Sequence, residues 1–298
     1  MENIQKGIYT YENLTGIDDS KLPTEIVVNE RISNEAVLIR LLSGTLNVKY
    51  TVNGEEKVIE QNTNYSVPGL LQNNSFSPNI IKDFFGFDKF NKSERKIVDD
   101  YLRVNRRNHF IHENLLSELT SAIVWQENSP IESFVHIYRA LEFISYSFPL
   151  IYASKSTDYR GTYEKLKKFM SGDSNGELKF FKTFIAELFK NNILINYEFE
   201  AYFLNGCEEK VKTELQRVIN NPYYEFDGNT LKIRLMNIID LIVTLRNRYF
   251  HMLVGQGMEN FYDVSYDKRD LFSALTPIFI NWLTLVYKEI VDYSVGLL

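Results

Sequence analysis

The feature that most constrains this fold is a run of apolar residues at helical spacing near the C-terminus, interrupted on one side by polar groups. At about 100° per residue, a helix over 230–253 has an inward stripe made of Leu235, Ile238, Leu241, Ile242, Leu245, Tyr249 and Met252. Asn247 and His251 fall together on nearly the opposite side, and Arg246 lies at the border with the reach to bend toward them. His251 therefore does not occupy the position of an ordinary core histidine.

A second apolar strip runs beside the line of Asn247 and His251 on the same helix. Its members are Met236, Ile239, Val243 and Phe250. A helix with two apolar faces is either deeply buried or buried in part by a second subunit. Because the polar residues lie at the edge of this strip, we expect a site at the seam of a homodimer that forms through this face.

Arg246, Asn247 and His251 have the chemistry to cleave a phosphodiester without a metal ion. An imidazole accepts or donates a proton near neutral pH, and the planar guanidinium matches the geometry of phosphate oxygens. The three residues are therefore the candidate catalytic group. The alternative is that Arg246 and His251 are simply surface residues on a core helix.

The spacing Arg246-Asn247-x-x-x-His251 resembles the motif of the HEPN family. Ribonucleases of that family carry an Arg, four to six residues and then a His, often with a polar residue directly after the Arg. An upstream segment, 134–143, contains a Tyr-Arg-x-Leu-Glu sequence similar to that of HEPN helices. The resemblance covers roughly residues 90–298 in the order of the helices, and nothing before them. It implies a helical bundle that dimerises, pairs two motifs in one cleft and cuts RNA without a metal ion.

The resemblance also implies a reaction: the RNA 2′-hydroxyl attacks the adjacent phosphate and leaves a 2′,3′-cyclic phosphate and a 5′-hydroxyl. In that reaction His251 moves protons at one or both oxygens, and Arg246 stabilises charge on the phosphoryl oxygens. Asn247 holds the imidazole or contributes a hydrogen bond to phosphate. No cofactor and no magnesium is required. The family commonly serves as toxins or antiphage effectors, so we expect RNA as the substrate.

Three charged residues are expected to support this group. Arg248 adds a second cation for RNA beside Arg246. Arg139 and Glu142 are three residues apart, and the simplest interpretation is an ion pair on the surface of their helix. A sharper interpretation is that Glu142 orients Arg246.

Two features argue against parts of this interpretation. The net charge is −6, whereas nucleic-acid binders are usually basic. Arginines in 103–107 and at 246 and 248 reduce this conflict between charge and function, because a small cleft needs few cations to bind RNA. Leu253 stands where HEPN toxins silenced by nucleotide transfer have a Tyr, which argues against that modification here. The alternative function is a non-catalytic HEPN-like module that dimerises or binds a partner protein.

The motif occurs a second time, from Arg107 and Asn108 to His112. On a helical wheel His112 lies on the apolar side, and Asn108 lies where a helix N-cap is expected. We therefore interpret His112 as structural and Asn108 as a cap, and we take the later copy as the candidate site. The sequence leaves open whether the earlier copy is functional.

Composition and motifs exclude several other classes. The single cysteine, Cys207, excludes internal disulfides and zinc clusters built on thiolates. The chain has no glycine-rich phosphate loop, dinucleotide-binding fingerprint or His-Glu-x-x-His sequence, so neither a cofactor nor a metal is predicted. The first residues lack the apolar stretch of a secretory signal, and the uncharged segment 271–287 is short for a membrane span. We expect a cytoplasmic protein without a membrane partner.

The spacing of apolar residues differs between two parts of the chain. Residues 1–80 have the pattern of a β-rich module, with strands expected at 24–28, 36–42, 46–52 and 55–59, a hairpin turn at Asn53-Gly54, and a linker over 69–78. Residues 90–298 have helical periodicity, with helices expected at 92–104, 109–125, 131–153, 158–171, 177–190, 208–220, 230–253 and 268–296. The predicted fold is mainly α, a HEPN-like helical bundle preceded by a small β-rich N-terminal module. That module is expected to sense a trigger, bind a regulatory protein partner or hold the nuclease inactive.

Overall fold

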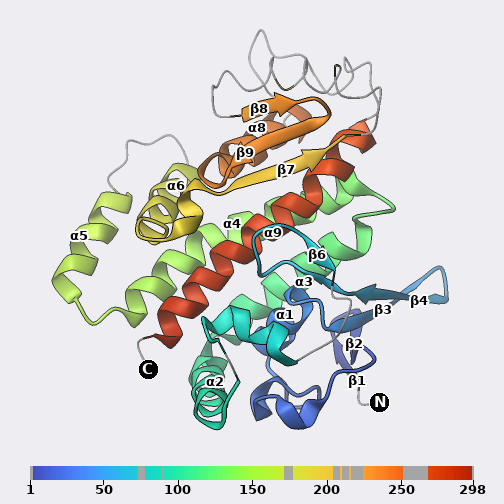
Figure 1. Ribbon diagram of the computed structural model, residues 1–298, viewed down its shortest axis with the longest axis vertical. Helices are drawn as coiled ribbons and strands as arrows, with labels where there is room; N and C mark the ends of the chain where they lie inside the picture. Colours follow the sequence, from blue (N-terminus) through green and yellow to red (C-terminus); the bar gives the residue numbers. More distant parts are fainter. Residues whose placement is uncertain are drawn as a thin grey trace.

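Two long helices, α4 (Pro130–Lys155) and α9 (Lys268–Val295), pack against each other through the middle of the molecule (Figure 1). The structure is a computed structural model that describes residues 3–72, 78–88, 90–170, 177–203, 209, 215, 224–250 and 268–296. Aromatic rings join the pair, because the ring centroid of Phe134 lies 4.8 Å from that of Phe272 and 5.9 Å from that of Phe279. Such rings bury large apolar areas, so this contact is a strong source of stability.

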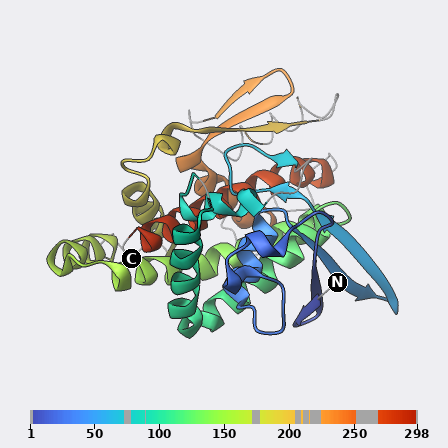
Figure 2. The ribbon, with the colours of Figure 1, turned by 60° about the horizontal axis from the view of Figure 1, so that its bottom comes forward.

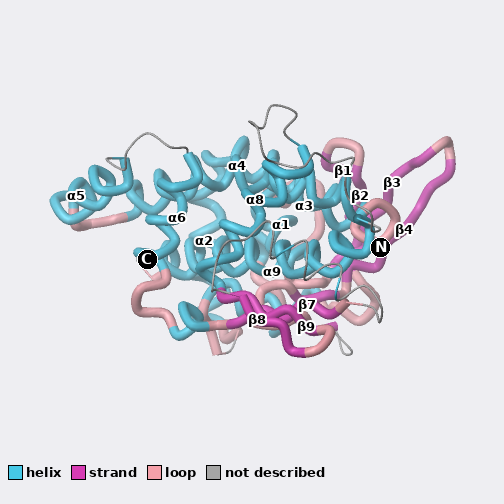
Figure 3. The backbone as a smooth tube through the Cα atoms, turned by 90° about the horizontal axis from the view of Figure 1, so that it is seen from above, coloured by secondary structure: helices cyan, strands magenta, loops and turns pink. Residues whose placement is uncertain are grey.

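The fold is mainly α, as predicted. Helix α3 (His109–Trp125) packs along α4, and α9 lies between α4 and a three-stranded sheet (Figure 3). The other described α-helices are α1 (Asn34–Leu42), α2 (Lys92–Asn105), α5 (Tyr159–Met170), α6 (Glu177–Leu188) and α8 (Ile238–Phe250). Short 3-10 helices are η1 (Asp19–Lys21), η2 (Thr24–Ile26), η3 (Pro78–Phe85), η4 (Arg106–Asn108), η5 (Ile193–Asn196) and η6 (Leu235–Asn237).

The strands form antiparallel sheets that lie in separate regions of the molecule (Figures 1 and 2). A four-stranded sheet has the order β1-β2-β3-β4, and a three-stranded sheet has the order β7-β9-β8. Two-residue strands β5 and β6 form a small third ladder. The bounds are β1 (Asn3–Lys6), β2 (Tyr9–Asn13), β3 (Leu46–Val52), β4 (Glu55–Gln61), β5 (Thr63–Asn64), β6 (Leu71–Gln72), β7 (Glu198–Tyr202), β8 (Tyr224–Asp227) and β9 (Thr230–Arg234).

The strand predictions for the N-terminal segment are half confirmed. Strand β3 spans the predicted 46–52, and Asn53 and Gly54 form the predicted turn with φ of 53° and 83°. The predictions for 24–28 and 36–42 are wrong, because 24–26 forms η2, 27–28 is a bend, and 36–42 lies in α1. All residues of 36–42 are buried, so the run has no polar face from which a period could be read. The helix start is set by Ser33, whose side chain accepts a hydrogen bond from the Ala36 amide.

Most predicted helices after residue 90 are confirmed to within a few residues. Helix α2, for example, starts with a capping box in which Asn91 and Glu94 each accept a hydrogen bond from the other's backbone amide. The start of the predicted helix 230–253 is wrong, because 230–234 forms β9 and the α-helix begins at Ile238. Burial alternates along β9, and the turn before it has Gly228 at φ 58°. Both features are typical of a strand that follows a turn, but the helical pattern of the residues that follow led to the prediction of one long helix. The predicted helix 208–220 lies outside the described residues, apart from 209 and 215, and residues 73–77 of the predicted linker do as well.

Buried hydrogen bonds attach the N-terminal segment to the helices. The hydroxyls of Tyr9 and Tyr11 on β2 lie 2.8 Å and 2.7 Å from those of Ser121 and Thr120 on α3. On the other side, the Asn281 amide group of α9 donates to the carbonyl oxygens of residues 65 and 67 at 2.7 Å and 2.9 Å. The apolar residues of the segment and of the helices form one continuous core.

One buried carboxylate links four helices. The Glu35 side chain of α1 is 3% exposed, and its Oε1 accepts from the Tyr101 hydroxyl at 2.7 Å and the Asn105 amide at 3.3 Å, both on α2. The same oxygen lies 3.5 Å from the Tyr287 hydroxyl of α9 and 3.5 Å from Nε2 of His112 on α3. Burial, reinforced by the Glu35 carboxylate, raises the pKa of Tyr101 and Tyr287 well above 10. Both hydroxyls therefore stay protonated and donate to Glu35.

Helix α9 carries the most apolar long stretch of the described chain. Residues 269–295 are long and apolar enough to cross a membrane, but 78% of the apolar window is buried inside the protein. Burial of that extent is typical of the core helix of a soluble protein. Pro277 lies inside this helix, and the helix continues on both sides of it.

A second acidic group near the end of α9 is poorly solvated. Asp292 lies beside Gly86, whose φ is 64°, and accepts a hydrogen bond from Lys288. Burial, with smaller contributions from Glu289 and Asp83, raises the pKa of Asp292 to about 6 despite the opposing charge of Lys288. The folded state therefore favours the protonated carboxyl.

The Glu35 junction is tested by Glu35→Leu and Glu35→Gln. The leucine leaves the Tyr101 hydroxyl, the Asn105 amide and His112 without their acceptor, and we expect a loss of about 3–5 kcal/mol in the free energy of unfolding. The glutamine keeps an acceptor of the same size and should cost clearly less. Urea denaturation followed by circular dichroism measures both, with Glu55→Gln on exposed β4 as the control. A loss below about 1 kcal/mol for Glu35→Leu would contradict a linking role.

Asp292→Asn tests the raised pKa. Because the folded pKa lies above the unfolded value of about 3.9, the stability from the protonated form is full below pH 4 and is lost as the pH rises through 6. At pH 7.5 the variant should exceed the wild type in free energy of unfolding, by at most about 3 kcal/mol. At pH 4 the two should be nearly equal. Equal stability of Asp292→Asn and wild type at both pH values would show that the carboxyl is well solvated.

Candidate functional site

Helix α8 carries two of the predicted site residues, Arg246 at the edge of its buried stripe and Asn247 on the side away from it. The inward stripe is confirmed for its described members, because Leu235, Ile238, Leu241, Ile242, Leu245 and Tyr249 are each at most 5% exposed. Met252 lies outside the described residues. Both ends of this segment are attached to α9: the Trp282 indole donates to the Leu235 carbonyl at 2.9 Å, and the rings of Tyr249 and Phe272 lie 5.6 Å apart. Arg246 and Asn247 are half-buried. The rotation of α8, and so the direction of these polar groups, is set by the core.

The Arg246 guanidinium is held from two sides. Its Nη1 donates to Oδ1 of Asn247 at 3.0 Å, and its central carbon lies 5.0 Å from the centre of the Tyr138 ring on α4. In the part of the chain that the structure describes, no carboxylate forms an ion pair with it. The Asn247 oxygen is thus used to position Arg246, which leaves its Nδ2 as the donor for a further group. A cation stacked on a ring and fixed by an amide is pre-organised for an anion.

Two predicted residues cannot be placed beside it. His251 lies outside the described residues, and of Arg248 only the backbone in α8 is described. The relation of the imidazole to Arg246 therefore stays a prediction. So does the homodimer seam, although the second apolar strip is partly covered within the chain itself. Ile239 is buried, and Met236 and Val243 are half-buried against the core.

The predicted ion pair between Arg139 and Glu142 is wrong. Arg139 Nη2 instead lies 2.8 Å from Glu118 on α3, and the other oxygen of that carboxylate lies 2.8 Å from Nδ1 of His136. The packing of α3 against α4 brings Glu118 close to Arg139, which therefore pairs with Glu118 and not with Glu142 on the next turn of its own helix. Among the described residues no ion pair joins Glu142 to Arg246 either. Sequence reasoning missed Glu118 and Tyr138 as partners of these arginines, because a contact between helices has no local signal.

The earlier motif copy is built into the core. His112 is 3% exposed, with Nε2 facing Glu35 and Nδ1 lying 3.2 Å from the backbone carbonyl of Asn108. Asn108 occupies the N-cap position of α3, but its side chain makes no capping hydrogen bond. Arg107 is exposed and is not brought together with the imidazole. The structural interpretation of His112 is confirmed, and the capping role predicted for the Asn108 side chain is wrong.

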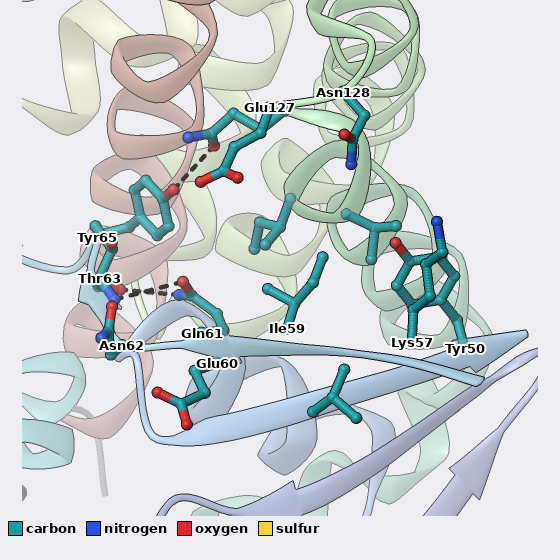
Figure 4. A pocket seen from close by; sticks show the side chains of 14 residues that line it. Tyr50, Lys57, Ile59, Glu60, Gln61, Asn62, Thr63, Tyr65, Glu127 and Asn128 are labelled. Carbon is teal, nitrogen blue, oxygen red and sulfur yellow. Dashed lines mark hydrogen bonds between the residues drawn. The ribbon is translucent and has the colours of Figure 1, made fainter. Parts of the chain in front are cut away.

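Two polar pockets lie elsewhere on the surface. One, with a volume of about 440 Å³, lies between β4 and the end of α3, where Tyr65 donates to Gln126 at 3.0 Å (Figure 4). The other, of about 550 Å³, lies between the β1–β2 hairpin and α3 and includes Lys6 and Glu113. Neither is lined by His or Cys, and neither contains a predicted site residue. The described residues contain no group of three His, Cys, Asp or Glu side chains arranged to hold a metal ion.

Compared with known proteins, the chain matches no protein-family profile, no curated sequence and no solved structure at a significant level. Its function is therefore inferred from the side chains and their geometry.

A double-mutant cycle tests the contact between Arg246 and Tyr138. Arg246→Met, Tyr138→Leu and the double variant should give a coupling of about 0.5–1 kcal/mol in the free energy of unfolding. Tyr138→Phe keeps the ring face, so the same cycle with phenylalanine should show almost no coupling between the phenol hydroxyl and the guanidinium. Urea denaturation measures all five variants. A coupling near zero in the leucine cycle, or an equal coupling in both cycles, would show that the ring face does not hold the guanidinium.

Proposed function

We propose that this chain is a metal-independent endoribonuclease of the HEPN type, with Arg246, Asn247 and His251 as its catalytic group. The observation that carries the proposal is the state of Arg246, half-buried and oriented by Tyr138 and Asn247, with no carboxylate partner among the described residues. A partly desolvated cation is unfavourable unless an anion neutralises it, and a phosphate of RNA supplies the charge that no described carboxylate provides.

In the proposed reaction the 2′-oxygen of RNA forms a bond to phosphorus, and the bond from phosphorus to the 5′-oxygen breaks. His251 moves the proton from the 2′-oxygen, and the proton gained by the 5′-oxygen comes from the same imidazole or from that of a second copy. Arg246 stabilises the negative charge on the phosphoryl oxygens. Asn247 orients Arg246 through its oxygen and has its Nδ2 group available for phosphate. The products are a 2′,3′-cyclic phosphate and a 5′-hydroxyl.

The neighbouring charged residues differ in the roles that this proposal gives them. Arg248 follows Asn247 on α8 and is retained as a second cation for RNA. Arg139 is already neutralised by Glu118, so its contribution to RNA binding is small. Glu142 does not orient Arg246 in this proposal, since Tyr138 and Asn247 have that role.

The biological setting of the proposal follows from the HEPN resemblance. It comprises a homodimer in the cytoplasm and a role as a toxin or antiphage effector. The N-terminal segment shares the core with the helices, so a regulatory protein that binds it can act on α3 directly. A HEPN-like module that only dimerises or binds a partner is the alternative, and the acidic net charge of −6 favours it.

The test is incubation of the purified chain with total RNA in EDTA. We expect cleavage by the wild type, with products that carry a 2′,3′-cyclic phosphate. His251→Ala should lower the rate about 10²–10⁴-fold, the usual contribution of proton transfer. Arg246→Lys should also lose activity, because an ammonium lacks the planar fork. Arg234→Lys is the matched control, since this surface arginine pairs with Glu198 on the neighbouring strand.

The proposal fails if wild type and His251→Ala leave RNA equally intact, or cleave it equally. An inactive chain that forms a stable dimer in sedimentation would support the non-catalytic alternative instead.

A further inference from the structure

Helix α5 exposes two large aromatic side chains one turn apart. Tyr159 is 84% exposed and Tyr163 is 62% exposed. At about 100° per residue, Arg160 and Lys167 fall within the same face, and both are exposed. The tyrosine–basic face, as defined by these four residues, therefore places rings and cations together along one side of a helix.

The side of α5 next to Tyr159 is the one that packs on the protein. Thr162 is buried and Leu166 is packed against the core. Lys165 forms an ion pair with Glu187 of α6 at 3.2 Å, and the Asp158 side chain accepts from the Gly161 amide at the helix start. The helix is thus held on one side while its tyrosine rings are open to solvent. Exposed rings of this size are unusual, because aromatic side chains normally contribute most by burial.

The charge around this face has the sign opposite to that of the whole protein. Residues 155–168 contain five basic and two acidic side chains, which are Lys155, Arg160, Lys165, Lys167 and Lys168 against Asp158 and Glu164, a local charge of +3 in a chain of net charge −6. Within the described part of the chain, no carboxylate pairs with Arg160 or Lys167, although Glu164 lies at the edge of the face. A basic surface that carries exposed rings has the two elements that bind single strands of nucleic acid, phosphate contacts and base stacking.

We infer that the tyrosine–basic face of α5 binds single-stranded RNA. The rings of Tyr159 and Tyr163 stack on bases, and Arg160 and Lys167 contact phosphates. This inference rests on the proposed function, since it supplies contacts to RNA beyond those of Arg246 and Arg248 in a protein of net charge −6. Because every base has a stackable face, binding at α5 is tolerant of sequence.

The position of α5 fits such a role. It follows directly on α4, the helix that carries Tyr138 beneath Arg246 (Figure 1). From Tyr138 to Lys155, the end of α4, the helix rises about 26 Å. A strand held on α5 is therefore a second contact at a distance from the bond to be cut, which favours extended single-stranded substrates over short ones.

Fluorescence anisotropy with a labelled twelve-nucleotide oligouridine tests the inference in EDTA. The His251→Ala protein is used throughout, so that cleavage does not interfere. Tyr159→Ser with Tyr163→Ser should raise Kd by about 5- to 150-fold for each base that no longer stacks on a ring. Arg160→Ser with Lys167→Ser should make the slope of log K against log salt shallower by about 1.4. Tyr202→Ser is the control, since Tyr202 is 68% exposed on β7, away from α5.

Unchanged RNA affinity in both double variants overturns the inference. The inference is also overturned if the double variants bind anionic lipid vesicles more weakly than the parent protein but bind RNA equally well. The proposed function fails separately. If the wild type does not cleave RNA but the tyrosine variants bind RNA more weakly, the α5 surface stands and the nuclease does not. If cleavage requires His251 and the α5 variants bind RNA as the wild type does, the nuclease stands and the surface is wrong.

Discussion

The structure depends on one buried carboxylate. Glu35 is enclosed by α1, α2, α3 and α9, and a charge at that depth is tolerable only with donors around it. Tyr101, Asn105 and Tyr287 supply those donors, with the His112 imidazole alongside. Each donor comes from a helix that must be correctly placed to reach the same oxygen. The junction therefore specifies how the N-terminal segment and the long helices dock.

The orientation of the candidate site residues also depends on packing against α9. Helix α9 holds α8 at both ends, and the buried stripe of α8 then determines where its polar residues point. Most arginines with described side-chain contacts pair with a carboxylate, as Arg139 does with Glu118. Arg246 instead rests on an aromatic ring and an amide. That difference is the basis of the proposal that Arg246 binds phosphate.

The two copies of the Arg-Asn-x-x-x-His motif have different environments, although their sequences are equivalent. His112 is buried against a carboxylate and Arg107 is exposed. Arg246 and Asn247 are half-buried and contact each other. Tyr159 and Tyr163 lie with the basic residues Arg160 and Lys167 on the exposed face of α5 that we infer binds RNA. Motif identity alone does not assign function, because burial decides which groups a ligand can reach.

The sequence by itself determined the features that depend on local periodicity and turn chemistry. These include the inward stripe of α8, the β3–β4 hairpin at Asn53-Gly54 and most of the later helices. Only the tertiary structure decided that 36–42 is a helix, since a run buried on all sides has no readable period. It alone placed Glu118 against Arg139 and Tyr138 beneath Arg246, because these contacts join residues on different helices. Packing chooses such partners by shape and charge across space, and no local spacing in the chain encodes that choice.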